Sequence, residues 1–325
     1  MGHKQRVVII GPGIMPIPPP NGWGAVESLV WDYKLFMDKY HGDKFETHVV
    51  NLPHTDQIIE ATNALTPDIV HIQYDNHANV AFKLKCKRIF LTSHYAYIDS
   101  MRYRPNDGYV WHINQFVAAA QAGHIIMALS PSIAQVYVSS GAPEENVWIQ
   151  HNGANDEVFR YTPTPTLPHK SVYLAKIDDR KRQHMYQTLS NLDFVGNIAD
   201  WRFVPNSNYL GEWPKYILYE NLTNYANLIL LSDGEAHPLV CCEALVCGLG
   251  LVISEFATAN LDTTLPFIDV IPNSRLNDLA YIEEVIKKNR ETCLSMRQEI
   301  RDYGIRTFSW RNVVNHYVRL LEKGR

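Results

Sequence analysis

The sequence predicts an α/β protein of two doubly wound domains, each a parallel sheet covered by helices on both faces. Three observations lead to this prediction. Short apolar runs alternate with helix-like runs along most of the chain. A proline-rich stretch interrupts the alternation near its middle, and 325 residues correspond to about two domains of ~150 residues.

Composition narrows the function classes. The chain is 46% hydrophobic with a formal net charge of −4, which excludes global disorder. Its 30 Lys and Arg against 34 Asp and Glu exclude a strongly basic nucleic-acid binder. No apolar run reaches the ~18 residues of a membrane-spanning helix, and Val7–Ile10 is too short for a signal peptide. Five cysteines without a C-x-x-C spacing favour a reducing compartment, so we expect a cytoplasmic protein with at most peripheral membrane contact.

The first half of the chain contains the clearest alternation. Its expected strands are Arg6–Ile10, Thr47–Asn51, Ile69–Gln73, Arg88–Thr92, Ile125–Leu129 and Val147–Gln150. The helices expected between them are Ala25–Tyr40, Asp56–Leu65, His112–Ala120 and Pro131–Ser139.

The stretch Tyr161–Pro168 holds three prolines and three threonines in eight residues, which is typical of a linker. Beyond it we expect strands at Ser171–Ala175, Asp193–Val195, Leu228–Ser232 and Gly250–Ser254. The expected helices are Lys181–Ser190, Pro214–Tyr225, Leu239–Cys247, Asn277–Lys288, Glu291–Tyr303 and Trp310–Glu322.

These elements predict a first domain at 1–162, a second at 163–304, and a helix within 305–325 that returns to the first domain. The returning helix is expected because its apolar residues follow helical spacing. Doubly wound domains bind ligands beyond the carboxyl ends of their strands, so a cleft between the two domains is the expected site.

The loop after the first strand is a candidate ligand loop. Its Gly11-Pro12-Gly13 lacks the third glycine of a dinucleotide fingerprint, because Pro16 stands there. Gly22, Gly24 and Ala25 then lead into a helix. Glycines at a helix N-terminus let backbone N–H groups approach an anion, but a plain turn fits equally well.

His94 follows an apolar strand and points toward the expected cleft. A lone histidine is usually a surface residue or a hydrogen-bonded interior one, so its functional interpretation needs support from elsewhere.

The second half offers a basic turn and a carboxylate pair. Lys176 and Lys181 follow the strand Ser171–Ala175 and are placed to face one anion; a solvated basic turn is the alternative. Glu235 and Glu243 flank a strand-to-helix turn in which Pro238 suits the first helical position. The N–H groups of Leu239 and Val240 then stay free for a ligand, although capping and surface ion pairs would also account for the glutamates.

Together these residues form a recognisable set. Glu235 and Glu243 make an E-x7-E motif in a strand–loop–helix that ends in Cys-Gly. Supporting elements are Trp23–Glu27, Asp68–His71, His94, Ser130, Asn152-Gly153, Phe159, the Lys176 and Lys181 pair, and Phe308–Trp310. Over nearly its whole length the chain resembles the GT-B-fold retaining glycosyltransferases of glycosyltransferase family 4, whose two Rossmann-like domains face each other across a cleft.

The resemblance implies a role for each site residue. Glu243 would hold the ribose of a nucleotide-sugar, and Lys176 and Lys181 would neutralise its diphosphate. Glu235 and the Ala236–Leu239 backbone would hold the sugar, and His94 would touch it near the anomeric carbon. The implied catalytic residues are His94, Glu235 and Lys181. The implied donor-binding residues are Gly22, Gly24, Ala25, Lys176, Lys181, Ala236, His237, Pro238, Leu239, Val240 and Glu243.

The implied activity is a retaining, hexosyltransferase-like transfer from a UDP- or GDP-sugar to a glycan or glycoconjugate hydroxyl, with the acceptor on the first domain. The donor is a substrate, and no cofactor is expected. No Asp-x-Asp sequence occurs, so we expect catalysis without a metal. Ala25, Lys176 and His237 depart from the family pattern, as does a short segment between Lys181 and Asn208. Two alternatives stay open: a nucleotide-sugar-binding protein without transfer activity, which Ala25 and Lys176 favour, and a sugar-nucleotide epimerase or hydrolase, whose donor binding would look alike.

Overall fold

A computed structural model describes residues 4–19, 24–100 and 108–323 of the chain. These residues divide into two compact units. The first comprises the described residues up to Asn152 together with those from Val313 onward, and the second comprises Gly153–Asn312.

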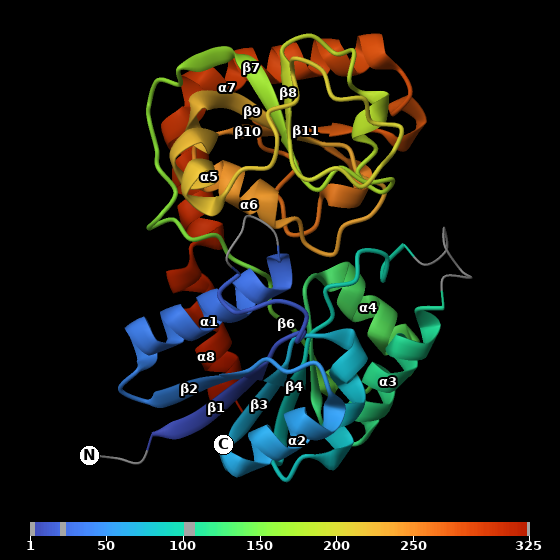
Figure 1. Ribbon diagram of the computed structural model, residues 1–325, viewed down its shortest axis with the longest axis vertical. Helices are drawn as coiled ribbons and strands as arrows, with labels where there is room; N and C mark the ends of the chain where they lie inside the picture. The colour runs from blue at the N-terminus through green and yellow to red at the C-terminus, as the bar shows by residue number, and fades with distance from the viewer. Residues whose placement is uncertain (1–3, 20–23, 101–107, 324–325) are drawn as a thin grey trace. The chain divides into compact units, whose positions relative to one another are not determined.

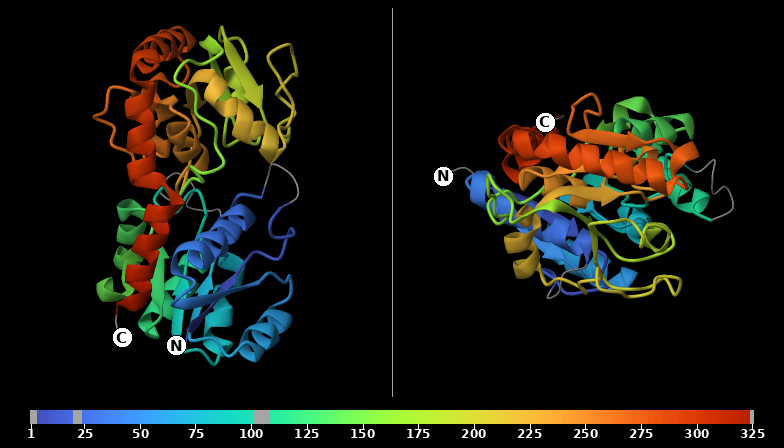
Figure 2. Two further views of the ribbon diagram at one scale, coloured as in Figure 1. Left: turned by 90° about the vertical axis from the view of Figure 1, so that its left-hand side faces the viewer. Right: turned by 90° about the horizontal axis from the view of Figure 1, so that it is seen from above.

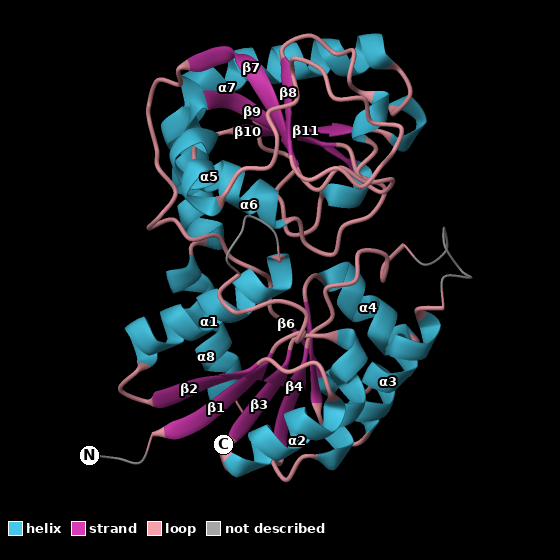
Figure 3. Ribbon diagram, in the orientation of Figure 1, coloured by secondary structure: helices cyan, strands magenta, loops and turns pink. Residues whose placement is uncertain are grey.

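The first unit is built on a six-stranded parallel sheet (Figures 1 and 3). Its strands are β1 (Gln5–Ile10), β2 (Phe45–Val50), β3 (Ile69–Ile72), β4 (Arg88–Leu91), β5 (Ile125–Ala128) and β6 (Val147–Ile149), in the order β2-β1-β3-β4-β5-β6. The helices are α1 (Ala25–His41), α2 (Thr55–Ala64), α3 (Val110–Gln121), α4 (Pro131–Ser139) and, from Val313 onward, α8 (Trp310–Glu322). Val7–Ile10 are fully buried, as expected of a strand covered on both faces.

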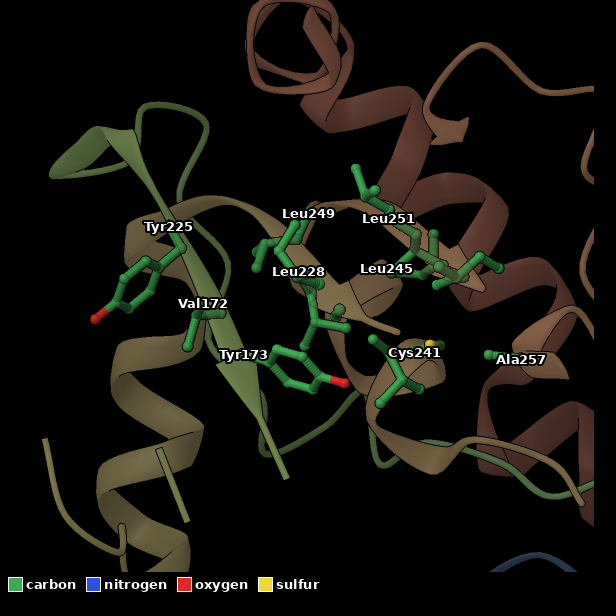
Figure 4. Packing of buried hydrophobic residues seen from close by; sticks show 14 of the residues in the cluster. Val172, Tyr173, Tyr225, Leu228, Cys241, Leu245, Leu249, Leu251 and Ala257 are labelled. Carbon is green, nitrogen blue, oxygen red and sulfur yellow. The ribbon is translucent and has the colours of Figure 1, made fainter. Parts of the chain in front are cut away.

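The second unit is built on a five-stranded parallel sheet in the order β11-β10-β9-β7-β8. Its strands are β7 (Leu167–Leu174), β8 (Leu192–Val195), β9 (Tyr225–Leu230), β10 (Gly250–Ser254) and β11 (Ile268–Ile271). The helices are α5 (Lys215–Asn221), α6 (Leu239–Val246) and α7 (Leu279–Phe308). Side chains from β7, β9, β10 and α6 interlock to form its core, with Cys241 among them (Figure 4).

Helix α7 packs along β7, β9, β10 and β11 and also contacts α6 (Figure 2). The contact with α6 is close because Gly304 has no side chain: a Cβ there would lie 2.7 Å from the backbone carbonyl carbon of Leu245. Residue 304 therefore helps to fix the position of α6, which carries Glu243.

The predicted α/β architecture with two separate parallel sheets is confirmed, and the strand order reverses once in each sheet. In the second unit, β8 pairs with one edge of β7 and β9 with the other. Such a switch point leaves a crevice at the carboxyl ends of the two central strands, where doubly wound folds bind ligands. In the first unit the same point lies between β1 and β3.

Several local predictions were wrong. Residues Lys181–Ser190 form turns around a short 3₁₀ helix at Gln183–Met185, because Arg182 adopts left-handed backbone angles (φ 57°) and Asp178 accepts a hydrogen bond from the Lys181 N–H. The two helices expected at Asn277–Lys288 and Glu291–Tyr303 are one continuous helix, α7, since no glycine or proline interrupts it there.

Smaller differences concern segment ends. The helix expected at Pro214–Tyr225 ends at Asn221, Leu222–Asn224 form a 3₁₀ helix, and β9 begins at Tyr225, three positions earlier than expected. Leu167 and Pro168 belong to β7, which extends into the expected linker. Strand β11 was not predicted.

No helix in the described ranges is long and apolar enough to cross a membrane.

Candidate functional site

The switch point of the second unit brings a buried cluster of charges together. The loop after β7 carries Arg180 and Lys181, and the loop after β9 carries Glu235. The Lys181 Nζ contacts Glu235 Oε1, and the Arg180 Nη1 lies 3.2 Å from the same oxygen. Lys181 and Glu235 are only 7% and 8% exposed. Two cations thus share one carboxylate, and we call these three residues the charge cluster.

Hydrogen bonds from the core and between the loops hold the charge cluster in place. The buried Tyr173 hydroxyl donates to the Lys181 carbonyl and accepts from the Leu231 N–H at 2.9 Å. Arg180 donates from Nη1 to the Gly234 carbonyl at 2.7 Å, and the Asp233 N–H donates to the Arg180 carbonyl at 2.9 Å. The two loops therefore position the charged groups before any ligand arrives.

The pKa values and net charge of the charge cluster reflect two cations around one carboxylate. Burial alone would raise the pKa of Glu235, but Lys181 and Arg180 lower it below its ordinary value. Burial also lowers the pKa of Lys181, and Glu235 opposes that shift. With all three groups ionised the cluster carries a net charge of +1, so it suits an anionic ligand.

Glu243 occupies a different environment on α6. Burial raises the pKa of its carboxyl to about 7, against a lowering effect from Lys215. No hydrogen bond from the described part of the chain reaches this carboxylate, so its acceptor capacity is available to a ligand. Pro238 precedes α6 as its N-cap, which corrects its expected place as the first helical residue. The N–H groups of Leu239 and Val240, at the start of α6, make no backbone hydrogen bond within the described residues.

The other predicted donor-binding residues of this unit differ in exposure. Lys176 is exposed, and its ammonium has no partner among the described residues. Ala236 and His237 are buried, and the His237 ring lies 5.8 Å from the Phe308 ring and 3.8 Å from the Cys242 thiol. The helix expected to begin at Lys181 is absent, so no helix dipole contributes at the two lysines.

In the first unit, Gly24 is the N-cap of α1 and has left-handed backbone angles (φ 101°) that favour glycine. Its carbonyl accepts hydrogen bonds from both the N–H and the hydroxyl of Ser28 at 2.9 Å. Ala25 is the exposed first residue of α1. Gly22 lies outside the described residues.

His94 follows β4 and is partly exposed. Its Nε2 lies 2.8 Å from the Oε1 of Gln73, which follows the neighbouring strand β3. Burial of the ring lowers the pKa of His94 to about 4, so the imidazole is neutral near pH 7.

Two site residues were missed from the sequence. Arg180 stands in a basic run whose spacing does not show which side chains turn inward. Gln73 was expected to end a strand, and only the pairing of β3 with β4 brings it to His94. Among the described residues no three His, Cys, Asp or Glu side chains gather as a metal site would need, and metal independence stays a prediction.

No family model and no curated protein matches the sequence. Solved structures, in contrast, align along the whole chain. A sucrose-phosphate synthase from Thermosynechococcus elongatus aligns with a TM-score of 0.74 at 13% identity, over 98% of this chain and 99% of the other. The Anabaena protein HepE, solved in complex with UDP-glucose, aligns with a TM-score of 0.72 at 12% identity, over 98% and 99%. The lipopolysaccharide outer core galactosyltransferase WaaB in its apo form aligns with a TM-score of 0.66 at 13% identity, over 98% and 100%.

The chain has the GT-B fold. The two described units, with six and five parallel strands, are the two Rossmann-like domains of that fold. At 12–13% identity the likeness concerns the fold, and the function rests on the site residues of this chain.

Proposed function

We propose that this GT-B protein is a retaining glycosyltransferase that moves a sugar from a UDP-sugar to a hydroxyl group of a glycan or glycoconjugate. The observation that carries the proposal is the charge cluster at the switch point of the second unit, with Glu243 on the helix that follows. The HepE structures were solved with UDP-glucose and with UDP, which favours a UDP-sugar over a GDP-sugar.

The reaction breaks the bond between the anomeric carbon and the β-phosphate oxygen. Negative charge then develops on the diphosphate and positive charge on the sugar ring. Lys181, Lys176 and the N–H groups at the start of α6 stabilise the leaving diphosphate. We add Arg180 to this set because it contacts the same carboxylate as Lys181. These groups supply the neutralisation without a metal ion.

The acceptor oxygen bonds to the anomeric carbon on the face that the diphosphate leaves, and its proton passes to a leaving phosphate oxygen. Glu243 accepts hydrogen bonds from the ribose, and Glu235 with the Ala236–Leu239 backbone holds the sugar hydroxyls. His94 contacts the transferred sugar near the anomeric carbon. The acceptor binds on the first unit, and the loop that contains Gly22, Gly24 and Ala25 covers the diphosphate or admits the acceptor.

A thermal-shift panel of UDP, GDP, ADP and their sugars tests donor binding first. A ligand at about 100 times its Kd stabilises the folded state by about 2.7 kcal/mol, which is readily measured. We expect UDP and a UDP-sugar to stabilise the protein most. If GDP or ADP does so instead, the nucleotide assignment is wrong, and if no nucleotide does, the proposal fails.

UDP release with and without sugar acceptors then decides between transfer and its alternatives. We expect release to require an acceptor, to persist in EDTA, and to give a product that keeps the donor's anomeric configuration by proton NMR. Release without acceptor would indicate a hydrolase, and a changed sugar on the recovered nucleotide would indicate an epimerase. Tight binding without turnover would indicate a binding protein. Loss of activity in EDTA that manganese or magnesium restores would contradict metal independence.

A further inference from the structure

A buried chain of hydrogen bonds links His94 to the interior of the first unit. The Thr92 hydroxyl donates to the Met127 carbonyl at 3.1 Å and lies 2.9 Å from His71 Nε2. The other ring nitrogen of His71, Nδ1, lies 2.9 Å from the Tyr317 hydroxyl and 3.2 Å from Gln73 Nε2. Gln73 Oε1 then lies 2.8 Å from His94 Nε2. We call Thr92, His71, Gln73 and Tyr317 the relay.

The donor and acceptor roles along the relay follow from the chemistry of each group. A hydroxyl has one hydrogen, and the Thr92 hydroxyl gives it to a carbonyl, which can only accept. Thr92 therefore accepts from His71, and the hydrogen of His71 sits on Nε2. His71 is fully buried among Tyr33, Phe90 and Tyr317, which disfavours a charged ring and leaves Nδ1 as an acceptor.

The same argument continues to His94. His71 Nδ1 presents a lone pair, so the Gln73 atom 3.2 Å from it is the amide NH₂, because the carbonyl oxygen there would set two lone pairs against each other; the carbonyl oxygen then faces His94. That oxygen can only accept, so the hydrogen of neutral His94 sits on Nε2. The Nδ1 of His94 makes no hydrogen bond to any described residue, and it keeps its lone pair.

We propose that the relay fixes His94 as the Nε2–H tautomer, so that its Nδ1 accepts a hydrogen bond from a hydroxyl group of the bound sugar or acceptor. Thr92, His71, Gln73 and Tyr317 are then positioning residues, because none of them needs to touch the substrate. His94 serves as a neutral hydrogen-bond acceptor and supplies no proton to the leaving group. The role of Nδ1 rests on the proposed function, whereas the tautomer does not.

The relay has one other arrangement in which every hydrogen bond has a donor and an acceptor, and it places the hydrogens of His71 and His94 on Nδ1. The two arrangements differ in the tautomer of His94, which can be measured. If His71 carried its hydrogen on Nδ1, it would donate to Tyr317 or Gln73, the Gln73 amide would be flipped, and His94 would carry its hydrogen on Nδ1. That arrangement would turn the Thr92 hydroxyl from the Met127 carbonyl toward His71.

The experiment is proton–nitrogen NMR on the full chain labelled with ¹⁵N-histidine, in which the two ring nitrogens of each tautomer have distinct shifts. The signals of His94 are assigned by their loss in His94→Ala. We expect the wild-type protein without ligand to show His94 as the Nε2–H form. An Nδ1–H form or an imidazolium at neutral pH would overturn the proposal, and this readout needs no relay variant to fold.

Thr92→Val tests the transmission, because it removes the acceptor of His71 Nε2–H and keeps the side-chain shape. We expect His71 to change to the Nδ1–H tautomer and donate to the Tyr317 hydroxyl. His94 should then change to the Nδ1–H form as well, although Thr92 does not contact His94. Thr92→Ser keeps the hydroxyl and is expected to keep the wild-type tautomer. Tyr317→Phe is the second control, since it leaves the Gln73 amide as donor to His71. An unchanged His94 spectrum in a folded Thr92→Val protein would overturn the relay.

Activity adds a separate readout. Thr92→Val is expected to lower kcat about tenfold, the effect of one lost hydrogen bond, with the Kd of UDP unchanged and with Thr92→Ser restoring kcat. If the tautomer changes as expected but no UDP-sugar is turned over by the wild-type protein, the proposed function fails and the relay stands. If transfer occurs and the tautomer does not respond, the relay fails alone.

Discussion

The ammonium group of Lys181 and the carboxylate of Glu235 form an ion pair in which both side chains are more than nine-tenths buried. The Arg180 Nη1 lies 3.2 Å from the same carboxylate oxygen, so neither cation is fully neutralised. A donor site needs its cations to be stable in the folded protein, and it needs positive charge left over for the ligand. Glu235 stabilises the buried Lys181 and the partly exposed Arg180, while the residual positive charge remains for a diphosphate.

Glu235→Gln is expected to change stability and nucleotide affinity in opposite directions. The amide leaves Lys181 and Arg180 facing each other without a carboxylate, which lowers the free energy of unfolding by about 3 kcal/mol, as for other broken buried pairs. A diphosphate would then take the place of the missing charge, so UDP should bind as tightly as to the wild type or more tightly. Urea unfolding and calorimetric titration with UDP measure the two effects.

Lys181→Met is the matched variant. It also breaks the pair and lowers stability, but it should weaken UDP at least about tenfold, because a charge-assisted contact to the diphosphate is lost. The double variant Lys181→Met with Glu235→Gln should be more stable than the sum of the single effects predicts. If the single variants change UDP affinity equally, Lys181 has no special relation to the diphosphate.

Glu243 gives a pH-dependent prediction. Its pKa is raised to about 7, so the folded protein prefers the neutral acid, and the ribose prefers the ionised carboxylate. UDP binding at pH 6.5 should therefore release up to about three-quarters of a proton from this group. Calorimetry in phosphate and in imidazole, whose ionisation enthalpies differ, measures the release.

Glu243→Gln is the control for that release, because UDP itself also titrates near this pH. The variant should release fewer protons on UDP binding than the wild type, by the share that Glu243 contributes. It should also bind UDP and the intact donor about 10- to 150-fold more weakly, as expected for a lost charge-assisted bond. A folded pKa above the ordinary value means that stability is present at low pH and is lost as the pH rises through about 7. Glu243→Gln should thus match the wild type in stability at pH 5 and exceed it at pH 8. A stability gain at pH 5 that disappears at pH 8 would contradict this.

Gly24→Ala should destabilise the first unit and the loop that leads into α1. The backbone there is left-handed, and an added Cβ would lie 3.3 Å from Glu27 Oε2, Met15 Sδ and Pro19 Cβ. Gly123→Ala is the control, because its φ of 91° is similar and nothing lies within 4 Å of its Cβ position. Both variants incur the left-handed cost of about 1–2 kcal/mol, and only Gly24→Ala adds the contact cost. Equal changes in Tm for the two variants would show that the atoms around residue 24 move to accommodate the added Cβ without a measurable loss of stability.

His94→Ala should lower turnover far more than nucleotide affinity, because we place His94 beside the sugar and away from the diphosphate. We expect kcat to fall at least about tenfold with the Kd of UDP within a factor of two. Single-turnover kinetics and titration with UDP separate the two quantities. An equal loss of both, or full activity, would remove His94 from the catalytic set.

The fold was predictable because its strands are continuous apolar runs. Runs such as Leu228–Leu230 and Leu251–Ile253 are typical of central strands in a sheet that is covered on both faces. The segment after β7 was not, because its course depends on one left-handed residue, Arg182, and on side-chain bonds to its backbone. Tyr186 and Leu189 of this segment are buried in the core of the second unit, so their spacing reflects burial from a turn-rich segment and not a helix.

The site was predictable as a set of residues but not as a set of contacts. Glu235 and Lys181 were both assigned to the catalytic set, yet their direct pairing depends on β9 lying next to β7, which the order of strands along the chain does not reveal. Gln73 and Thr92 carry no chemical signal in the sequence. Their role follows from the pairing of β3 with β4, which brings the ends of those strands together.

The two outer cations of the site should respond differently to salt. Lys176 is exposed and has no partner among the described residues, whereas the Arg180 side chain is 28% exposed and is bonded to the Gly234 carbonyl and to Glu235. A screened surface charge contributes mainly at low ionic strength, because the Debye length falls from about 30 Å at 0.01 M to about 8 Å at 0.15 M. Lys176→Met should therefore weaken UDP binding much more at low salt than at 0.15 M, while Arg180→Met should weaken it similarly at both. Titrations of the two variants with UDP across this salt range decide the point, and an equal salt dependence in the two variants would contradict the prediction.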